Sequence, residues 1–237
     1  MSHTTKPEQE GVRNHHSRRN FLLYSGATVA ATGLMLSGCE PYFPTPMPGN
    51  NGEGGIDLGS GDVGILNYAY ALEQLEAAFY TKVIDRPFGG MTSKERDLLE
   101  DLKEHEIIHR EFFKAALGTN AIPGLEVDFS GIDFSDRMSV LGTAKAFEDL
   151  GVSAYNGAGR LIKDVNYLLL AGKIVSVEAR HAAAIRSIFG DDATAFAGDD
   201  IVDPLTGLDV AKSPQTVLAT ASKFLKTKLN GSNLPTM

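Results

Sequence analysis

The chain has 237 residues, a formal net charge of −8 and 43% hydrophobic residues. This length gives room for one domain of ordinary size plus appendages, and the composition is that of a soluble globular protein. The acidic balance argues against a nucleic-acid partner, which needs a concentrated basic surface. The single cysteine, Cys39, excludes a disulfide within the chain.

Residues 1–38 are predicted to be an export signal. The segment SRRNFL at 17–22, with Arg18 and Arg19, resembles the twin-arginine signal of bacterial export. An apolar stretch diluted with small residues follows, and the sequence LSGC that ends at Cys39 resembles a lipobox. We therefore expect cleavage before Cys39 and lipidation of that residue. A plain membrane anchor and an Arg-Arg pair that arose by chance are the alternatives.

This signal also predicts a location and two partners. We expect export by the twin-arginine machinery and attachment to a membrane through the lipid, on the periplasmic side of the cell envelope. Because Glu40 and not Asp follows the cysteine, the outer membrane is favoured. The twin-arginine route carries folded proteins, so a metal can be loaded before export. Residues 39–60, rich in Pro and Gly, are expected to be a flexible tether after the lipidated cysteine.

Four long helices and one short helix are predicted in the rest of the chain. Apolar residues recur at intervals of three or four, which is the period of a helix with one buried face. Thr92 and Glu95 form a capping box at the start of the second helix, and Ser213-Pro214 is an N-cap and first-position pair for the short one. The predicted ranges are 62–83, 92–117, 137–163, 165–189 and 214–229.

The connections between these helices favour a bundle. Residues 119–136 are too many for a tight turn and suit a long crossover between the second and third helices. Strand signals are too sparse for a sheet. We predict an all-α four-helix bundle over 61–190, followed by a loop and a short packing helix over 191–237. Glycines within the third helix each cost about 1 kcal/mol relative to alanine, so a close helix approach or room around a site should account for some of them. They are Gly142, Gly151, Gly157 and Gly159.

One pattern of residues occurs twice in this bundle. The segments LEQLEAAFY (72–80) and FEDLGVSAY (147–155) align Glu73 with Glu148 and Tyr80 with Tyr155. Each half then continues with a Glu-x-x-His motif. The offsets are 75 residues (73 to 148) and 72 residues (106 to 178), which indicates one helical hairpin that has been duplicated. The two motifs are Glu106–His109 and Glu178–His181.

The residue types in this pattern predict a metal site. Glu and His three apart on a helix differ by about 60° around the axis, so both can point into one bundle interior. Four carboxylates and two imidazoles in this order are the ligand set of dinuclear sites in four-helix bundles. Two divalent cations would offset four buried negative charges. Glu and His without Cys favour iron or manganese, with zinc as an alternative. The predicted ligands are Glu73, Glu106, His109, Glu148, Glu178 and His181.

Two tyrosines are expected near the same site. Tyr80 and Tyr155 follow Glu73 and Glu148 by seven residues, nearly two helical turns, and so lie on about the same face. Each can donate a hydrogen bond to a ligating carboxylate across the bundle. The alternative is that both are core aromatics whose hydroxyls find other partners.

Two further residues lie close to these ligands in the sequence. Glu76 follows Glu73 by one turn and competes with it as a ligand. The repeat pairs Glu76 with Gly151, and therefore favours Glu73. His105 is expected to be a surface residue, because neighbours on a helix point about 100° apart and Glu106 faces inward.

The doubled motifs over about 62–190 resemble the ferritin-like superfamily. The closest resemblance is to exported ferritin-like domain proteins, a group that includes plant and bacterial desiccation-related proteins. It implies a non-haem centre with two iron or manganese ions per chain. Glu106 and Glu178 would bridge the ions, while Glu73 and Glu148 would be terminal or shifting ligands. Family chemistry includes oxidation of ferrous iron by dioxygen or peroxide, peroxide disproportionation and oxygenation.

The fold alone does not choose among these reactions. We expect an envelope-anchored dimetal oxidase or a peroxide-consuming protein. The alternative is a non-catalytic stress or interaction protein that uses the bundle as a scaffold. A storage cage is disfavoured, because a lipid tether and a C-terminal extension complicate packing into a closed shell.

Overall fold

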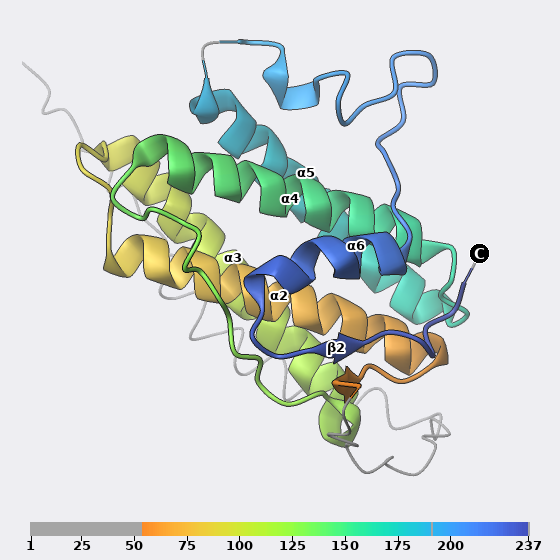
Figure 1. Ribbon diagram of the computed structural model, residues 1–237. Coiled ribbons are helices and arrows are strands. Elements are labelled where there is room, and N and C mark those ends of the chain that lie inside the picture. Colours follow the sequence, from red (N-terminus) through yellow and green to blue (C-terminus); the bar gives the residue numbers. More distant parts are fainter. Residues whose placement is uncertain (1–53, 191, 237) are drawn as a thin grey trace, which may run out of the picture. The chain divides into compact units, whose positions relative to one another are not determined.

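The computed structural model describes residues 54–190 and 192–236. The predicted signal with Arg18 and Arg19, the lipidation site Cys39 and most of the tether lie outside these residues. The described part is mostly helical, which confirms the predicted all-α bundle (Figure 1). None of its helices is both long and apolar enough to span a membrane. The four long helices are α2 (Gly61–Asp85), α3 (Ser93–Leu117), α4 (Arg137–Gly159) and α5 (Val165–Phe189).

The long helices form two hairpins that pack on each other, α2 with α3 and α4 with α5. The connection between the hairpins opens with the short helix η1 (Gly118–Asn120) and runs back along the bundle to the start of α4 (Figure 1). Side chains of α2 hold it in place. Asn67 donates to the carbonyl of Asn120 at 2.9 Å and accepts from the N–H of Ile122 at 3.0 Å. Gln74 accepts from the N–H of Leu125 at 2.9 Å. This segment is the predicted crossover.

Local signals set the start of α3. The hydroxyl of Thr92 accepts from the N–H of Glu95 at 3.2 Å, and the Glu95 carboxylate accepts from the N–H of Thr92 at 2.8 Å. These two bonds satisfy N–H groups that the first turn of a helix leaves free. The predicted capping box is therefore present.

Long-range contacts set the end of α4, which stops at Gly159, before the predicted end at Lys163. The carboxylate of Asp62, in the first turn of α2, accepts from the N–H groups of Lys163 and Asp164, both at 2.8 Å. Asp164 then caps α5 by accepting from the N–H of Asn166 at 2.7 Å. The turn between α4 and α5 is thus held by a residue about 100 positions earlier in the chain. No local sequence pattern indicates this contact.

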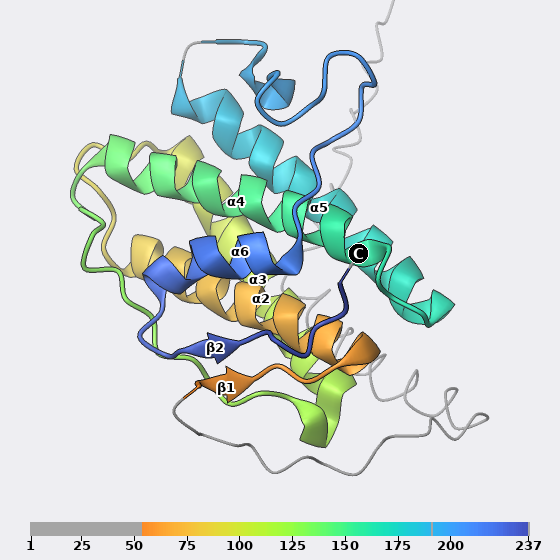
Figure 2. The ribbon, with the colours of Figure 1, turned by 45° about the vertical axis from the view of Figure 1, so that its right-hand side comes forward.

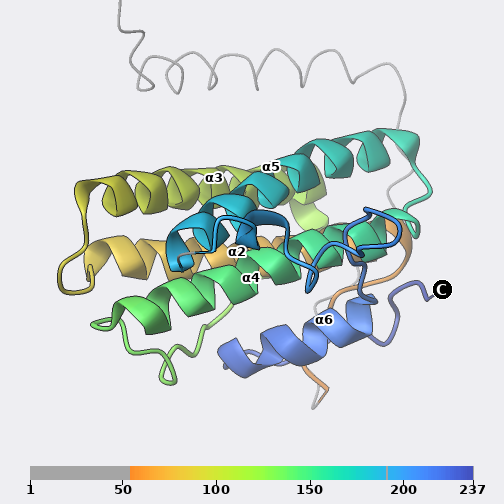
Figure 3. The same ribbon diagram turned by 90° about the horizontal axis from the view of Figure 1, so that it is seen from above.

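The C-terminal helix α6 (Pro214–Ala221) is shorter than the predicted 214–229 and passes into the short helix η3 (Ser222–Phe224). Ser213 caps it, as predicted, by accepting from the N–H of Thr216 at 3.3 Å. The helix lies beside α4 (Figure 3). The ring of Phe224 meets that of Phe147 edge-on, with centroids 4.7 Å apart. α6 therefore packs on the outside of the bundle.

The chain then forms the strand β2 (Leu229–Asn230), which pairs in parallel with β1 (Ile56–Asp57) (Figure 2). Leu58, which follows β1, is fully buried. The sequence predicts a flexible tether that extends to residue 60, but residues 56–60 belong to the folded domain, because β1 pairs with a strand near the C-terminus and Leu58 is buried.

Two contacts hold the segment between α5 and α6. Arg186 is buried and forms ion pairs with Asp149 of α4 at 2.8 Å and with Asp200 at 2.7 Å, beyond the short helix η2 (Ala195–Ala197). Further along, the carbonyl oxygen of Lys212 would lie 1.7 Å from a Cβ added at Gly157. Only glycine allows this approach, which accounts for one of the glycines in α4.

Candidate metal centre

The six predicted ligands meet in the middle of the bundle interior. In each hairpin the first helix contributes one glutamate and the second helix contributes a Glu-x-x-His motif. The Glu and His of the motif lie on one face of the helix because they are three residues apart. The four carboxylates are 0–1% exposed, and the imidazoles of His109 and His181 are 12% and 4% exposed. From α2 to α5 the residues are Glu73, Glu106 with His109, Glu148, and Glu178 with His181.

The six residues form two overlapping groups. In each group, one ligand atom from every member lies within 4.8 Å of the others. Glu106 and Glu178 belong to both groups, so a pair of cations held here would share these two carboxylates. The first group is Glu73, Glu106, His109 and Glu178, and the second is Glu106, Glu148, Glu178 and His181.

The imidazoles face the carboxylates through their Nδ1 atoms. His109 Nδ1 lies 2.9 Å from Glu178 Oε1 and 3.4 Å from Glu73 Oε2. His181 Nδ1 lies 2.8 Å from Glu106 Oε1 and 3.9 Å from Glu178 Oε2. Neither nitrogen meets the geometry of a hydrogen bond in these contacts. In each ligand group one histidine nitrogen and the carboxylate oxygens therefore point to the same small space.

The donor set fits bound cations. In the described residues, nine buried side-chain nitrogen or oxygen atoms make no hydrogen bond, and eight of them belong to the six predicted ligands. The ninth is the hydroxyl of Tyr68. A buried polar atom without a partner is costly, and such atoms mark strain, function or a missing ion. Carboxylate oxygens and imidazole nitrogens suit iron or manganese.

A comparison with known families agrees with this geometry. Residues 61–191, more than half of the chain, match a family described as a ferritin-like domain. The chain belongs to the ferritin-like domain family. A search of curated proteins finds no match. The match covers all four long helices of this ferritin-like domain. The narrower resemblance to desiccation-related proteins, and the twin-arginine lipoprotein signal, stay predictions.

The two tyrosines of the ferritin-like domain bind carboxylates of the opposite hairpin. The hydroxyl of Tyr80 on α2 donates to Glu148 Oε1 on α4 at 2.5 Å. The hydroxyl of Tyr155 on α4 donates to Glu73 Oε1 on α2. In both glutamates the second oxygen, Oε2, has no hydrogen bond and points to the centre. The tyrosines thus orient the two carboxylates that are not shared between the groups.

Charge at the centre of the ferritin-like domain is unevenly distributed. Burial raises the pKa of Glu73 to about 7, and burial with the neighbouring carboxylates raises the pKa of Glu178 well above its usual range. Burial would also raise the pKa of Glu106, but the imidazoles of His109 and His181 outweigh it and lower that pKa to about 2. Burial opposes the charged form of His181, yet the carboxylates around it raise its pKa to about 11. The centre therefore favours bound positive charge.

A fifth carboxylate, Glu76, lies beside these four. It is 4% exposed, and burial followed by the charges of its neighbours raises its pKa well above the usual value. Its counterpart in the repeat, Gly151, leaves it room, because a Cβ added there would lie 3.2 Å from Glu76 Oε1. Glu73 belongs to the first ligand group, whereas Glu76 belongs to neither. The second half of the repeat therefore has glycine where the first half has this acid.

His105 is exposed, as predicted for a surface residue, but it also contacts the site. Its Nδ1 lies 2.9 Å from Nε2 of His181, and the two rings stack with centroids 5.1 Å apart. The prediction missed this contact because it used only the angle to Glu106. His105 is also four residues before His109 and so shares a face with it, which was the available signal. The contact leaves Nδ1 of His181 free to face the centre.

Proposed function

We propose that this protein is an envelope-anchored ferritin-like protein with a site for two iron or manganese ions, where ferrous iron would be oxidised by dioxygen or peroxide, or peroxide consumed. The observation that supports it is the pair of ligand groups that share Glu106 and Glu178. Two groups with common ligands would hold two metal ions close enough for both to act on one oxidant.

Such a pair of ions supplies two one-electron changes between the divalent and trivalent states. Oxidation of two ferrous ions releases two electrons. Dioxygen accepts them with two protons and leaves as hydrogen peroxide, or hydrogen peroxide accepts them with two protons and leaves as two water molecules. Residues of the chain bind and orient the reactants and keep bulk water away, since the carboxylates are almost fully buried.

Each ligand has a distinct task in this proposal. Glu106 and Glu178 would hold both ions, and the remaining glutamate and histidine of each group would hold one. The hydroxyls of Tyr80 and Tyr155 keep the two terminal carboxylates oriented. His105 contacts Nε2 of His181 and so helps to orient that ligand. Supporting residues of this kind commonly change metal affinity by about 10–100-fold when removed.

The place in the cell is part of the proposal and is supported by the sequence. The twin-arginine segment with Arg18 and Arg19 would direct export of the folded, metal-loaded protein, and lipidation of Cys39 would attach it to the membrane, with the outer membrane favoured. Substitution of both arginines by lysine should retain the protein in the cytoplasm. Cys39→Ala should release it from the membrane fraction. Unchanged fractionation of both variants would contradict this location.

Metal analysis of the protein exported through its own signal tests the centre. We expect two iron or manganese ions per chain, and their loss in Glu106→Ala and His181→Ala. Glu104→Ala is the matched control, because that glutamate lies on the same helix with a 47% exposed side chain. Substoichiometric metal in the parent protein would contradict the dimetal centre. Ferroxidase and catalase assays then separate the reactions. A metal-loaded protein inactive in both would favour the alternative role as a stress or interaction scaffold.

A further inference from the structure

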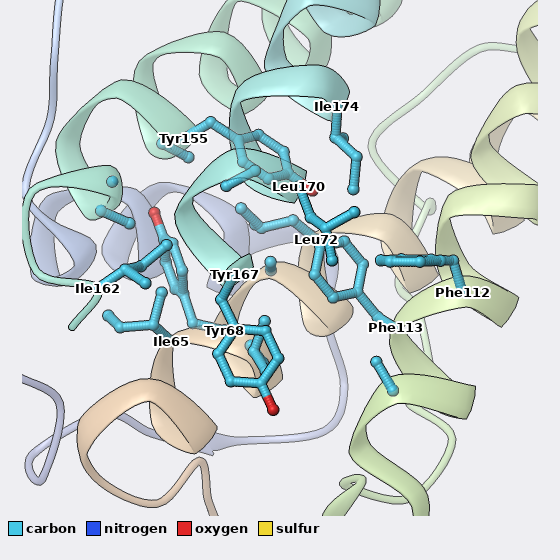
Figure 4. A pocket seen from close by; sticks show the side chains of 17 residues that line it. Ile65, Tyr68, Leu72, Phe112, Phe113, Tyr155, Ile162, Tyr167, Leu170 and Ile174 are labelled. Atoms are coloured by element: carbon cyan, nitrogen blue, oxygen red, sulfur yellow. The ribbon is translucent and has the colours of Figure 1, made fainter. Parts of the chain in front are cut away.

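A small apolar cavity lies in the bundle interior beside the metal centre (Figure 4). Its volume is about 30 Å³, and all four long helices contribute to its wall. Three tyrosines are the only wall residues whose side chains carry a polar atom. A cavity needs a volume of about 10–15 Å³ to hold one water-sized molecule, so this cavity has room for a small diatomic molecule.

The cavity lies one helical turn from the ligands. Ala69, Phe113 and Ile174 line it, and each is four residues from a predicted ligand on its own helix. Four residues span about 6 Å along a helix axis. On α4, Tyr155 lines the cavity while its hydroxyl donates to Glu73. This tyrosine therefore joins the cavity wall to the metal centre.

The cavity also reaches toward the solvent. Phe112 of α3 lines it and is 38% exposed, and Tyr167 and Leu170 of α5 line it and are half-buried. In Figure 4 these side chains come from α3 and α5 and surround the same cavity as Tyr155 and Ile174. The wall thus extends from the surface between α3 and α5 to the residue that touches Glu73.

Small side chains create this space, and the repeat shows that it is not required by the fold. Ala154 and Ala158 line the cavity on α4. Their counterparts 75 residues earlier are Phe79 and Val83, both fully buried. The ring of Phe79 fills the corresponding region of the other hairpin, where it packs against four aromatic rings.

We propose that this cavity conducts dioxygen to the metal centre, and that dioxygen and not peroxide is the oxidant of this protein. The inference rests on the proposed function. Dioxygen is small and apolar, and an apolar wall accepts it without cost. Hydrogen peroxide carries donors and acceptors that need partners when buried. The hydroxyl of Tyr155 is already bound to Glu73. The hydroxyl of Tyr68 has no hydrogen-bond partner, but the surface that the wall presents to the cavity is almost entirely apolar, so peroxide finds little to bind there.

Xenon tests the cavity without any metal, because dry apolar cavities bind it. In crystals of the metal-free protein under xenon pressure, we expect density between Tyr155 and Ile174. The double variant Ala154→Phe/Ala158→Val, which copies the filled hairpin, should lose that density. Ala158→Val alone narrows the cavity with one added side chain and serves if the double variant does not fold. Absence of xenon from the parent protein would overturn the inference.

Kinetics of the metal-loaded protein test the choice of oxidant. Filling the cavity should lower kcat/KM for dioxygen by roughly tenfold, equivalent to about 1.4 kcal/mol in the barrier, and leave metal content and the rate with peroxide unchanged. Ala78→Val, half-buried on α2 outside the cavity, is the matched control. An unchanged rate with dioxygen, or equal losses with both oxidants, overturns the inference and leaves the proposed function standing. Absence of bound metal overturns both.

Discussion

The bundle interior has two ends, one on each side of the layer formed by the predicted metal ligands. The duplicated hairpin builds both ends. At one end, large side chains around Phe79 fill the space. At the other end, smaller side chains at the aligned positions leave the cavity. The six predicted ligands between them keep the same residue types in both halves, whereas the neighbouring Glu76 is matched by Gly151. Ligands are constrained by the geometry of the ions, whereas the packing behind them only has to support the helices. The aligned pairs are Phe79 with Ala154, Val83 with Ala158, and Phe147 with Leu72.

The largest effect of a substitution is expected from removing the central ring of the filled end. Phe79→Ala should lower the free energy of unfolding by about 3–5 kcal/mol, because the ring is fully buried among four others. Phe113→Ala, at the cavity end, should cost less, since the space beside it already lacks contacts. Urea unfolding of the metal-free proteins measures both. Equal costs would remove the distinction between the ends.

A pH effect is expected in the layer between the two ends. Burial raises the pKa of Glu73 to about 7, above its usual 4.5. A raised pKa stabilises the fold below the usual value, and that stability is lost as pH rises through the folded value. The raised pKa of His181, about 11 against 6.5, acts in the same direction above pH 6.5. By linkage the metal-free protein should therefore lose on the order of 5 kcal/mol of stability between pH 5 and pH 8.

Urea unfolding at several pH values checks this slope. Added metal needs deprotonated carboxylates and neutral imidazoles, so the loaded protein should lose less stability, or gain some, over the same range. If the metal-free protein is more stable at pH 8 than at pH 5, burial does not raise the pKa of Glu73 in the metal-free protein.

Substitutions of the two tyrosines should lower the stability by the same amount but differ in their effect on the cavity. Tyr80→Phe and Tyr155→Phe each remove the donor to a buried carboxylate, which costs about 1–3 kcal/mol. Only Tyr155 lines the cavity, so only its variant should alter xenon occupancy. Thermal unfolding and xenon crystals measure the two effects. A change of xenon occupancy in Tyr80→Phe would contradict the separation of the ends.

The smallest effect is expected from one aligned pair of alanines. Ala69 lines the cavity and its counterpart Ala144 is fully buried near the filled end. Ala69→Val should change stability by less than about 1 kcal/mol, because the added methyl groups have space. Ala144→Val should cost more, about 1–3 kcal/mol, because it overpacks a filled region. Denaturation midpoints of the two variants give the comparison directly.

Features with a local or repeated signal could be predicted from the sequence. The start of α3 follows from the hydroxyl of Thr92, and the six ligands follow from the doubled spacing of Glu and His. The end of α4 could not be predicted, because Asp62 sets it from about 100 positions away. Likewise β1 could not be predicted, since its partner strand lies near the C-terminus.

Details around the centre needed the three-dimensional arrangement. The spacing of His105 and His109 shows that they share a face of α3, but the partner of His105 lies on another helix and could not be read from that spacing. The burial of Glu76 depends on the absence of a side chain at Gly151 across the bundle. The cavity depends on the sizes of side chains from four helices at once, and no single segment of sequence contains that information.

The crossed hydrogen bonds of Tyr80 and Tyr155 carry a consequence for the chain as a whole. Each hairpin presents one tyrosine and one carboxylate that find their partners only on the other hairpin. Two identical hairpins facing each other across a two-fold axis would satisfy both pairs at once. The domain thus has the symmetry of a homodimer whose subunits share one polypeptide. Joining the halves by a crossover lets each acquire substitutions separately, which an assembly of identical subunits does not allow.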